Sequence, residues 1–161
     1  LSKAVKYLQK NQQHNGAWLP LWFGNQNTWD KKNPVYGTAK VSIYIVDTLK
    51  CSWIDYKLRS ELQLMLSSAQ NYLLQQQNLD GSWGGYKDLE GSIEETTLAI
   101  CALAKKDKTV CAKAFEWLEN EYKANGLRSK PIGLYFATLW YDEKMYPLTF
   151  NIEALRRVLE N

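Results

Sequence analysis

Six residue types recur in this sequence with identical spacing. Residues 3–18 carry an alanine, an aromatic residue, a leucine, a glutamine, a glycine and a tryptophan, and residues 68–83 carry the same types in the same order. A third, partial copy starts at Lys113 and has Arg128 in the place of the tryptophan. A unit that recurs in this way predicts a fold made of structural repeats. The recurring residues are Ala4, Tyr7, Leu8, Gln12, Gly16 and Trp18, then Ala69, Tyr72, Leu73, Gln77, Gly81 and Trp83, and finally Ala114, Trp117, Leu118, Tyr122 and Gly126.

The spacing has a structural interpretation. The alanine, the aromatic residue and the leucine fall at i, i+3 and i+4, which places them on one face of a helix. The glycine permits the left-handed turn that ends the helix, and the glutamine can bond to backbone groups left free there. The tryptophan is expected to fold back over the helix end and cover the next helix. We therefore interpret six residues as structural clasps that join outer helices: Gln12, Gly16, Trp18, Gln77, Gly81 and Trp83.

Hydrophobic periodicity predicts helices along the whole chain. Two kinds of helix alternate, and this alternation is typical of two concentric layers, as in an α/α toroid or a helical solenoid. Pro147 is predicted to stop the last apolar helix. The amphipathic, outer helices are expected at 2–13, 58–77, 110–123 and 152–159, and the more apolar, inner helices at 36–49, 92–104 and 131–144.

Composition argues against several classes of protein. The net charge of +3 is small and the basic residues form no patch, so nucleic-acid binding is not indicated. The three cysteines are far apart and lack metal-ligand spacing, which fits a reducing compartment, and Cys101 and Cys111 are interpreted as small core residues. No apolar run reaches the roughly 18–20 residues of a membrane span. Since Leu1 falls inside a helical pattern, we expect residues 1–161 to be one domain of a longer protein.

The Gln-x-x-x-Gly-x-Trp element resembles the QW motif of the squalene-hopene and oxidosqualene cyclases, within the terpene cyclase family. The block from Gly16 to Asn25, followed by Asn33-Pro34-Val35-Tyr36-Gly37-Thr38, is similar to the family block that ends in Tyr-Gly-Thr. The stretch from Ile132 through Leu148 resembles the family's C-terminal aromatic helix. The resemblance covers nearly the whole chain and implies an all-α fold: a partial α/α toroid, the C-terminal part of a squalene-cyclase-like barrel.

The same resemblance implies a chemistry. The family protonates a polyene or its epoxide and steers carbocations through a ring cascade, an isomerase reaction of triterpenoid biosynthesis. The acid is an aspartate in an Asp-x-Asp-Asp motif, and this sequence has no such motif. We therefore expect the chain to be inactive alone. The implied partners are a squalene-like isoprenoid bound by the full-length protein and the rest of the toroid. No cofactor and no metal are implied.

Three residues match cavity positions of the family. Tyr36 matches the motif tyrosine that helps to reprotonate the acid through water, which makes it the catalytic candidate. Trp22 and Tyr141 are candidate substrate-binding residues, because an aromatic face stabilises a passing cation by about 0.5–2 kcal/mol. Aligned on Tyr141, the other aromatic positions of the hopene-forming enzymes fall on Leu134 and Thr138, so the late ring-forming steps are not supported.

Other interpretations stay open. A non-catalytic, cyclase-like scaffold that binds a lipid or a protein is one alternative, because the C-terminal helix departs from the family pattern. A class II diterpene cyclase is another, since it has the same toroid. The β subunit of protein prenyltransferases needs a zinc site, which one histidine, His14, does not supply. Glu95 is predicted to form a capping box with Ser92. For its neighbour Glu94 we consider either a favourable place at a helix N-terminus or a cavity mouth, where it would bind a cation or a polar group.

Two expectations concern the surroundings of the chain. Inner helices without their partners leave apolar surface exposed, so the isolated chain is expected to self-associate. The family resemblance also implies a location on the cytoplasmic side, with membrane association through the full-length protein.

Overall fold

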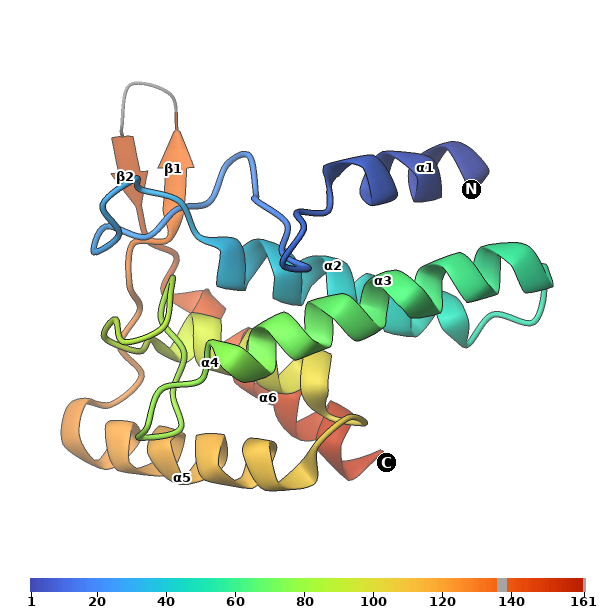
Figure 1. Ribbon diagram of the computed structural model, residues 1–161. Coiled ribbons are helices and arrows are strands. Elements are labelled where there is room, and N and C mark those ends of the chain that lie inside the picture. Colours follow the sequence, from blue (N-terminus) through green and yellow to red (C-terminus); the bar gives the residue numbers. More distant parts are fainter. Residues whose placement is uncertain (136–138, 161) are drawn as a thin grey trace.

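The computed structural model describes residues 1–135 and 139–160 (Figure 1). Within this range the chain is mostly helical, with one short hairpin. The elements are α1 (Ser2–Asn11), α2 (Pro34–Leu49), α3 (Tyr56–Gln75), α4 (Ile93–Leu103), α5 (Lys108–Asn125), β1 (Gly133–Tyr135), β2 (Leu139–Tyr141) and α6 (Met145–Leu159). The all-α prediction is therefore confirmed, apart from the hairpin.

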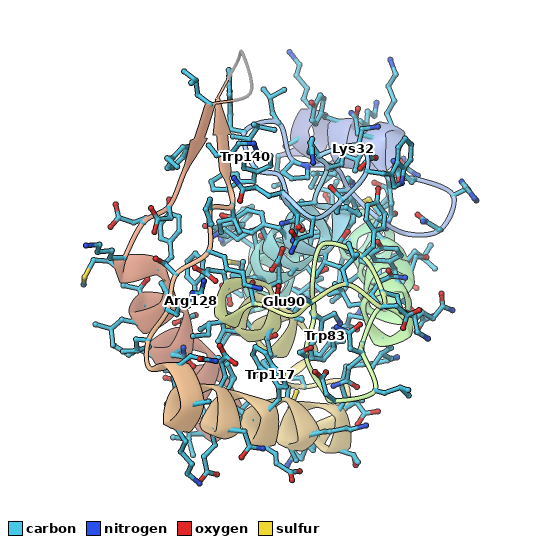
Figure 2. The ribbon with its side chains drawn as sticks, turned by 90° about the vertical axis from the view of Figure 1, so that its left-hand side faces the viewer. Lys32, Trp83, Glu90, Trp117, Arg128 and Trp140 are labelled. Carbon is cyan, nitrogen blue, oxygen red and sulfur yellow. The ribbon has the colours of Figure 1, made fainter. Side chains whose placement is uncertain are left out.

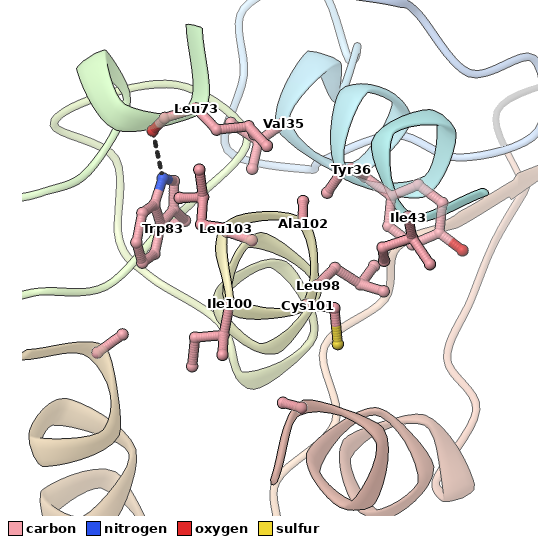
Figure 3. Close-up of a cluster of buried hydrophobic side chains, with 14 of the residues drawn as sticks. Val35, Tyr36, Ile43, Leu73, Trp83, Leu98, Ile100, Cys101, Ala102 and Leu103 are labelled. Atoms are coloured by element: carbon pink, nitrogen blue, oxygen red, sulfur yellow. Dashed lines mark hydrogen bonds between the residues drawn. The ribbon is translucent and has the colours of Figure 1, made fainter. Parts of the chain in front are cut away.

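Helix α4 lies at the centre of the molecule. All of its residues are buried, and it packs against α2, α3, α5 and α6. Helices α2, α4 and α6 form an inner layer, and α1, α3 and α5 lie around it (Figure 1). The main core joins α4 to its neighbours through residues such as Leu73, Trp83, Leu98 and Leu103 (Figure 3). A second cluster, which includes Val5, Trp18, Ile45, Leu62 and Met65, joins α1 to α2 and α3.

The helices start where side-chain caps satisfy free backbone N–H groups. Asn33 Oδ1 accepts from the N–H of Tyr36 at 3.0 Å, and Pro34 is in the first turn of α2, where a missing N–H costs nothing. Asp55, Ser92 and Asp107 cap α3, α4 and α5 in the same way. These caps fix the starts of the inner and outer helices within a residue or two of the sequence prediction.

The helix predicted at 131–144 is wrong. Strands β1 and β2 form an antiparallel hairpin there, with Gly133 opposite Tyr141 and Leu134 opposite Trp140. The loop before α2 supplies the backbone partners, since the N–H of Leu134 donates to the carbonyl of Trp22 at 2.9 Å. Glycine disfavours a helix and aromatic residues favour a strand, so the long-range pairing overrides the helical period of Leu134, Leu139 and Tyr141. Phe136, Ala137 and Thr138 lie outside the described residues.

Pro147 does not end a helix as predicted. It is the third residue of α6, where its missing N–H would have no partner within the helix anyway. Consequently α6 starts at Met145, well before the predicted start at 152, and packs on α4 as the third inner helix. The assignment of 152–159 to the outer layer is corrected accordingly. Ala154, on the face that meets α4, is fully buried.

Two further observations concern the described residues as a group. None of their helices is long and apolar enough to cross a membrane. Cys101 and Cys111 are buried free thiols, as predicted, and burial raises their pKa values to about 12 and about 11.

Candidate functional site

The tryptophans of the two complete repeats have matching environments. The indole N–H of Trp18 donates to the carbonyl of Leu8 at 2.9 Å, and that of Trp83 donates to the carbonyl of Leu73 at 2.8 Å (Figure 3). Each acceptor is in the last turn of the helix that precedes the tryptophan. Each ring therefore satisfies a carbonyl at the end of an outer helix.

The two tryptophans also hold the inner helices. The backbone N–H of Trp18 donates to the hydroxyl of Thr38 on α2 at 2.9 Å, and that of Trp83 donates to the hydroxyl of Thr96 on α4 at 3.0 Å. An outer helix end and an inner helix are thus fixed by one residue.

The glutamines reach the next outer helix rather than their own. Gln12 Nε2 donates to the carbonyls of Gly16 and Met65, both at 2.9 Å. Gln77 Nε2 donates to the carbonyls of Gly81 and Val110, at 2.9 and 3.2 Å. Met65 and Val110 occupy equivalent places, three residues before the start of the second and third copies. We call each such unit of glutamine, glycine and tryptophan a clasp.

The glycines of the clasps permit close approach of two backbones. Gly16 and Gly81 have φ values of 93° and 99°, and a Cβ atom there would lie 2.4 Å from the Ser68 carbonyl oxygen and 2.6 Å from that of Lys113. Gly126, in the third copy, has a φ of 69°, but a Cβ atom there would meet nothing within 4 Å. The third copy therefore receives a clasp from the second without forming one among the described residues.

An aromatic hollow of about 370 Å³ lies between α2, α6 and the loop before α2. The Tyr36 side chain stacks on Phe23 with ring centroids 4.3 Å apart, and Tyr146 stacks on Phe150 at 5.1 Å. A volume in this range with mostly apolar walls is typical of small-molecule sites. The lining residues are Trp18, Leu19, Pro20, Phe23, Tyr36, Gly37, Lys40, Val41, Tyr146 and Phe150.

Two features determine the electrostatics of the hollow. Burial raises the pKa of Tyr36 far above its ordinary value, and the nearby Tyr146 and Tyr141 add to the effect, so the hydroxyl keeps its proton. The ammonium of Lys40 lies 5.0 Å from the centroid of Phe150, and burial lowers its pKa. The hollow thus combines aromatic faces, a neutral hydroxyl and one cation.

The three predicted cavity residues are placed differently with respect to the hollow. Tyr36 lines the hollow, whereas Trp22 does not, and its side chain is 48% exposed. The Tyr141 ring lies against Gly133 in the hairpin, where a Cβ atom would be 2.1 Å from the ring. Trp140, its neighbour in β2, packs over Gly24 (Figure 2).

Sequence reasoning missed Phe23, Lys40, Tyr146 and Phe150. A signal existed for the last three, since Lys40 follows Tyr36, and Phe150 follows Tyr146, at the i, i+4 spacing of one helix face. The second pair was hidden by the prediction that Pro147 interrupts the helix.

Two buried glutamates stand at the start of α4. Glu95 Oε1 accepts from the side-chain amides of Asn25 and Asn33 at 2.6 and 2.8 Å, and Oε2 accepts from the Ser92 hydroxyl. The N–H of Glu95 in turn donates to Ser92 Oγ at 3.1 Å, which confirms the N-cap half of the predicted capping box. The other half is not formed, because the Ser92 N–H donates to the carbonyl of Trp83 at 3.0 Å. Glu95 therefore joins the loop before α2 and the first turns of α2 and α4, and its burial raises its pKa.

Glu94 has fewer partners. Its Oε1 accepts from the backbone N–H of Lys130 at 2.9 Å, while its buried Oε2 has no hydrogen-bond partner in the described part of the chain. Burial raises the pKa of this carboxyl to about 7. Glu94 is not among the residues that line the hollow. Across residues 1–135 and 139–160, no group of three or more His, Cys, Asp or Glu side chains has a geometry suited to a metal ion.

Comparison with known proteins adds a family context. No protein-family model matches the chain. The chain is 34% identical over 83 residues to the squalene hopane cyclase afumA of Aspergillus fumigatus, a match that covers 52% of this chain and 10% of that protein. The resemblance to squalene-hopene cyclases that the repeats indicated is therefore confirmed in sequence.

Solved structures share the fold. The type II terpene cyclase MstE from Scytonema matches with a TM-score of 0.57 and 18% identity over 74% of this chain and 33% of that one. An MstE variant in complex with merosterolic acid A, its product, matches with a TM-score of 0.58 and 19% identity, over 78% of this chain and 34% of that one. The described fold is a partial α/α toroid, and the chain spans about a third of the length of these cyclases.

Proposed function

We propose that this chain is the C-terminal section of a terpene cyclase of the squalene-hopene type, and that it has no cyclase activity alone. The aromatic hollow is the main observation in support. Tyr36, Phe23, Tyr146 and Phe150 give it the apolar, aromatic walls that an isoprenoid chain requires. The absence of an Asp-x-Asp-Asp motif from the sequence supports the second part of the proposal, since a separate segment would have to supply the acid.

In this proposal Tyr36 acts in proton return. Its hydroxyl remains protonated at neutral pH, because burial raises its pKa, so it serves as a hydrogen-bond donor and acceptor in a water chain and not as a base. Trp22 and Tyr141 contact substrate only once the remaining cavity wall is present. The exposure of the Trp22 side chain is compatible with this role.

The rest of the toroid is the proposed partner, and helix α1 supplies the evidence. Ala69 and Ala114 are fully buried beneath a clasp, whereas the equivalent Ala4 is exposed. The side chain of Tyr7 is 67% exposed, and that of the equivalent Tyr72 is only 4% exposed. We infer that a preceding repeat covers this face of α1 in the full-length protein.

The proposed function is tested with the full-length protein, incubated with squalene and analysed for cyclised products by mass spectrometry. Cyclised products are expected from the full-length protein and none from residues 1–161 alone. Tyr36→Phe in the full-length protein should slow turnover, and an unchanged rate would remove its role in proton return.

In the absence of the other repeats, α1 should drive self-association of the isolated chain, and a monomer in light scattering would contradict that expectation.

A second candidate is a non-catalytic scaffold that binds a lipid. It is favoured by Lys40, because a fixed cation in the hollow repels a carbocation. The two candidates differ in the test above: a scaffold binds an isoprenoid without converting it. In either case we propose a location on the cytoplasmic side, with any membrane contact made by the full-length protein.

A further inference from the structure

Lys40 projects from α2 into the aromatic hollow. Its Nζ atom lies 5.0 Å from the Phe150 ring centroid and 5.9 Å from that of Tyr44. These two ring contacts are its interactions in the described part of the chain, where it forms no ion pair or hydrogen bond. A half-buried ammonium held only by ring faces is incompletely compensated, since a ring face is a weaker partner for a cation than a carboxylate is.

An acid on the same face of α2 as Lys40 is already engaged. Asp47 lies two turns further along the same face of α2. Its Oδ1 accepts from Arg157 Nη1 at 3.0 Å and from Lys50 Nζ at 2.9 Å. The other groups that act on Lys40 are the Tyr44 ring and the buried Cys101 thiol, which stays neutral because its pKa is raised to about 12. Within residues 1–135 and 139–160, none of these contacts gives Lys40 a counter-charge, which is left to be supplied from elsewhere.

The positive charge of Lys40 restricts which ligands the hollow can bind. A cation close to Lys40 would be repelled, whereas an anion at the same place would be attracted as strongly. The aromatic walls around the ammonium suit an apolar chain and offer few other polar groups. One cation in such surroundings matches one negative charge.

We propose that the hollow binds an elongated apolar molecule with a carboxylate head, and that the ammonium of Lys40 pairs with that carboxylate. The tail lies against Phe23, Tyr36, Tyr146 and Phe150, while the head is placed at α2. The inference deepens the proposed function, and it rests on that function only for the isoprenoid nature of the tail.

The experiment measures binding, by calorimetry at pH 8 and below micelle-forming concentrations, with the full chain. Four probes share one tail and differ in the head: farnesoic acid, farnesol, farnesylamine and farnesyl diphosphate. Farnesoic acid should bind about tenfold more tightly than farnesol, the size expected for a charge-assisted contact, and farnesylamine should bind most weakly. Lys40→Met, which keeps length and apolar bulk, should reduce the affinity for farnesoic acid to that for farnesol, while Lys40→Arg should retain the preference. Lys6→Met, at an exposed lysine of α1, is the matched control and should change nothing.

The outcomes separate the two ideas. Equal binding of acid, alcohol and amine would overturn the role of Lys40 and leave the isoprenoid hollow of the proposed function intact. Tighter binding of the diphosphate than of the acid would overturn the carboxylate assignment. An acid preference that survives in Lys40→Met, in a protein with an unchanged melting temperature, would place the anion elsewhere. Absence of binding by all four probes would overturn the carboxylate proposal, while the cyclase assignment would still be decided by the product analysis with the full-length protein.

Discussion

The side-chain amide of Gln12 lies 2.9 Å from the carbonyl oxygen of Met65, across 53 residues of sequence. Gln77 makes the equivalent contact with Val110 at 3.2 Å. Each glutamine also donates to the glycine carbonyl of its own clasp, so one amide holds a loop and the next outer helix together. The repeat is therefore a device that links successive outer helices rather than a cap on a single helix.

Removal of a clasp glutamine should destabilise the fold. Gln12→Ala or Gln77→Ala deletes two hydrogen bonds to partly buried carbonyls, so a loss of about 1–3 kcal/mol in the free energy of unfolding is expected. Gln9→Ala, at an exposed position of α1, is the control and should stay within about 0.5 kcal/mol of wild type. Urea unfolding followed by circular dichroism measures the difference. Equal stability of all three variants would show that the clasp contacts are not stabilising.

The three glycines with positive φ should differ in their response to alanine. Gly16→Ala and Gly81→Ala combine an unfavourable φ with a clash against a neighbouring backbone, whereas Gly126→Ala carries the φ cost alone, of about 1–3 kcal/mol. The first two should therefore lose more stability than the third in the same urea titration. If Gly126→Ala lost the most stability of the three variants, the backbone clash at Gly16 and Gly81 would not explain their need for glycine.

Glu94 should make stability fall as the pH rises. Its pKa is about 7 in the folded chain and 4.5 for an unperturbed glutamate. Between these values the folded state holds more protons than the unfolded state, so the free energy of unfolding decreases with pH by up to roughly 3 kcal/mol. This loss of stability is absent below pH 4.5, where Glu94 is protonated in both states, and complete above pH 7, where it is ionised in both.

The variant Glu94→Gln tests this sign, because it keeps an acceptor for the Lys130 N–H and cannot ionise. It should match wild type near pH 5 and exceed it in urea unfolding at pH 8. Parallel pH profiles for the two proteins would mean that Glu94 ionises in the folded state as easily as in water.

Two adjacent arginines of α6 should contribute very differently. The Arg157 side chain is 8% exposed and pairs with Asp47 across 110 residues, which joins α6 to α2. The Arg156 side chain is 44% exposed and pairs with Glu153 in α6 and with Glu160 directly after α6. Arg157→Gln should cost about 2 kcal/mol or more, since it removes a bidentate contact between helices. Arg156→Gln should cost less than about 1 kcal/mol. Thermal unfolding of both variants distinguishes the cases, and equal melting temperatures would argue against the link between the helices.

The sequence alone determined most of the helices and the positions of the clasps, because the patterns that mark them are local. The i, i+3, i+4 pattern and the cap at Ser92 act within a few residues, and the Gln-x-x-x-Gly-x-Trp element is recognised by its short spacing. The partners of its glutamines, Met65 and Val110, lie in other helices and were not predicted. The two layers followed from the alternation of apolar and amphipathic helices, although the third inner helix was placed too early in the chain.

Tertiary structure decided the rest. Residues 133–135 became a strand because the loop at Trp22 supplied backbone partners more than a hundred residues away. The hollow formed because α6, which begins before Pro147, brought Phe150 to Lys40 on α2. Strand pairing and the walls of a cavity depend on segments that meet only after folding, whereas helix periods and caps depend on neighbours in the chain, and this difference in range explains which features the sequence revealed.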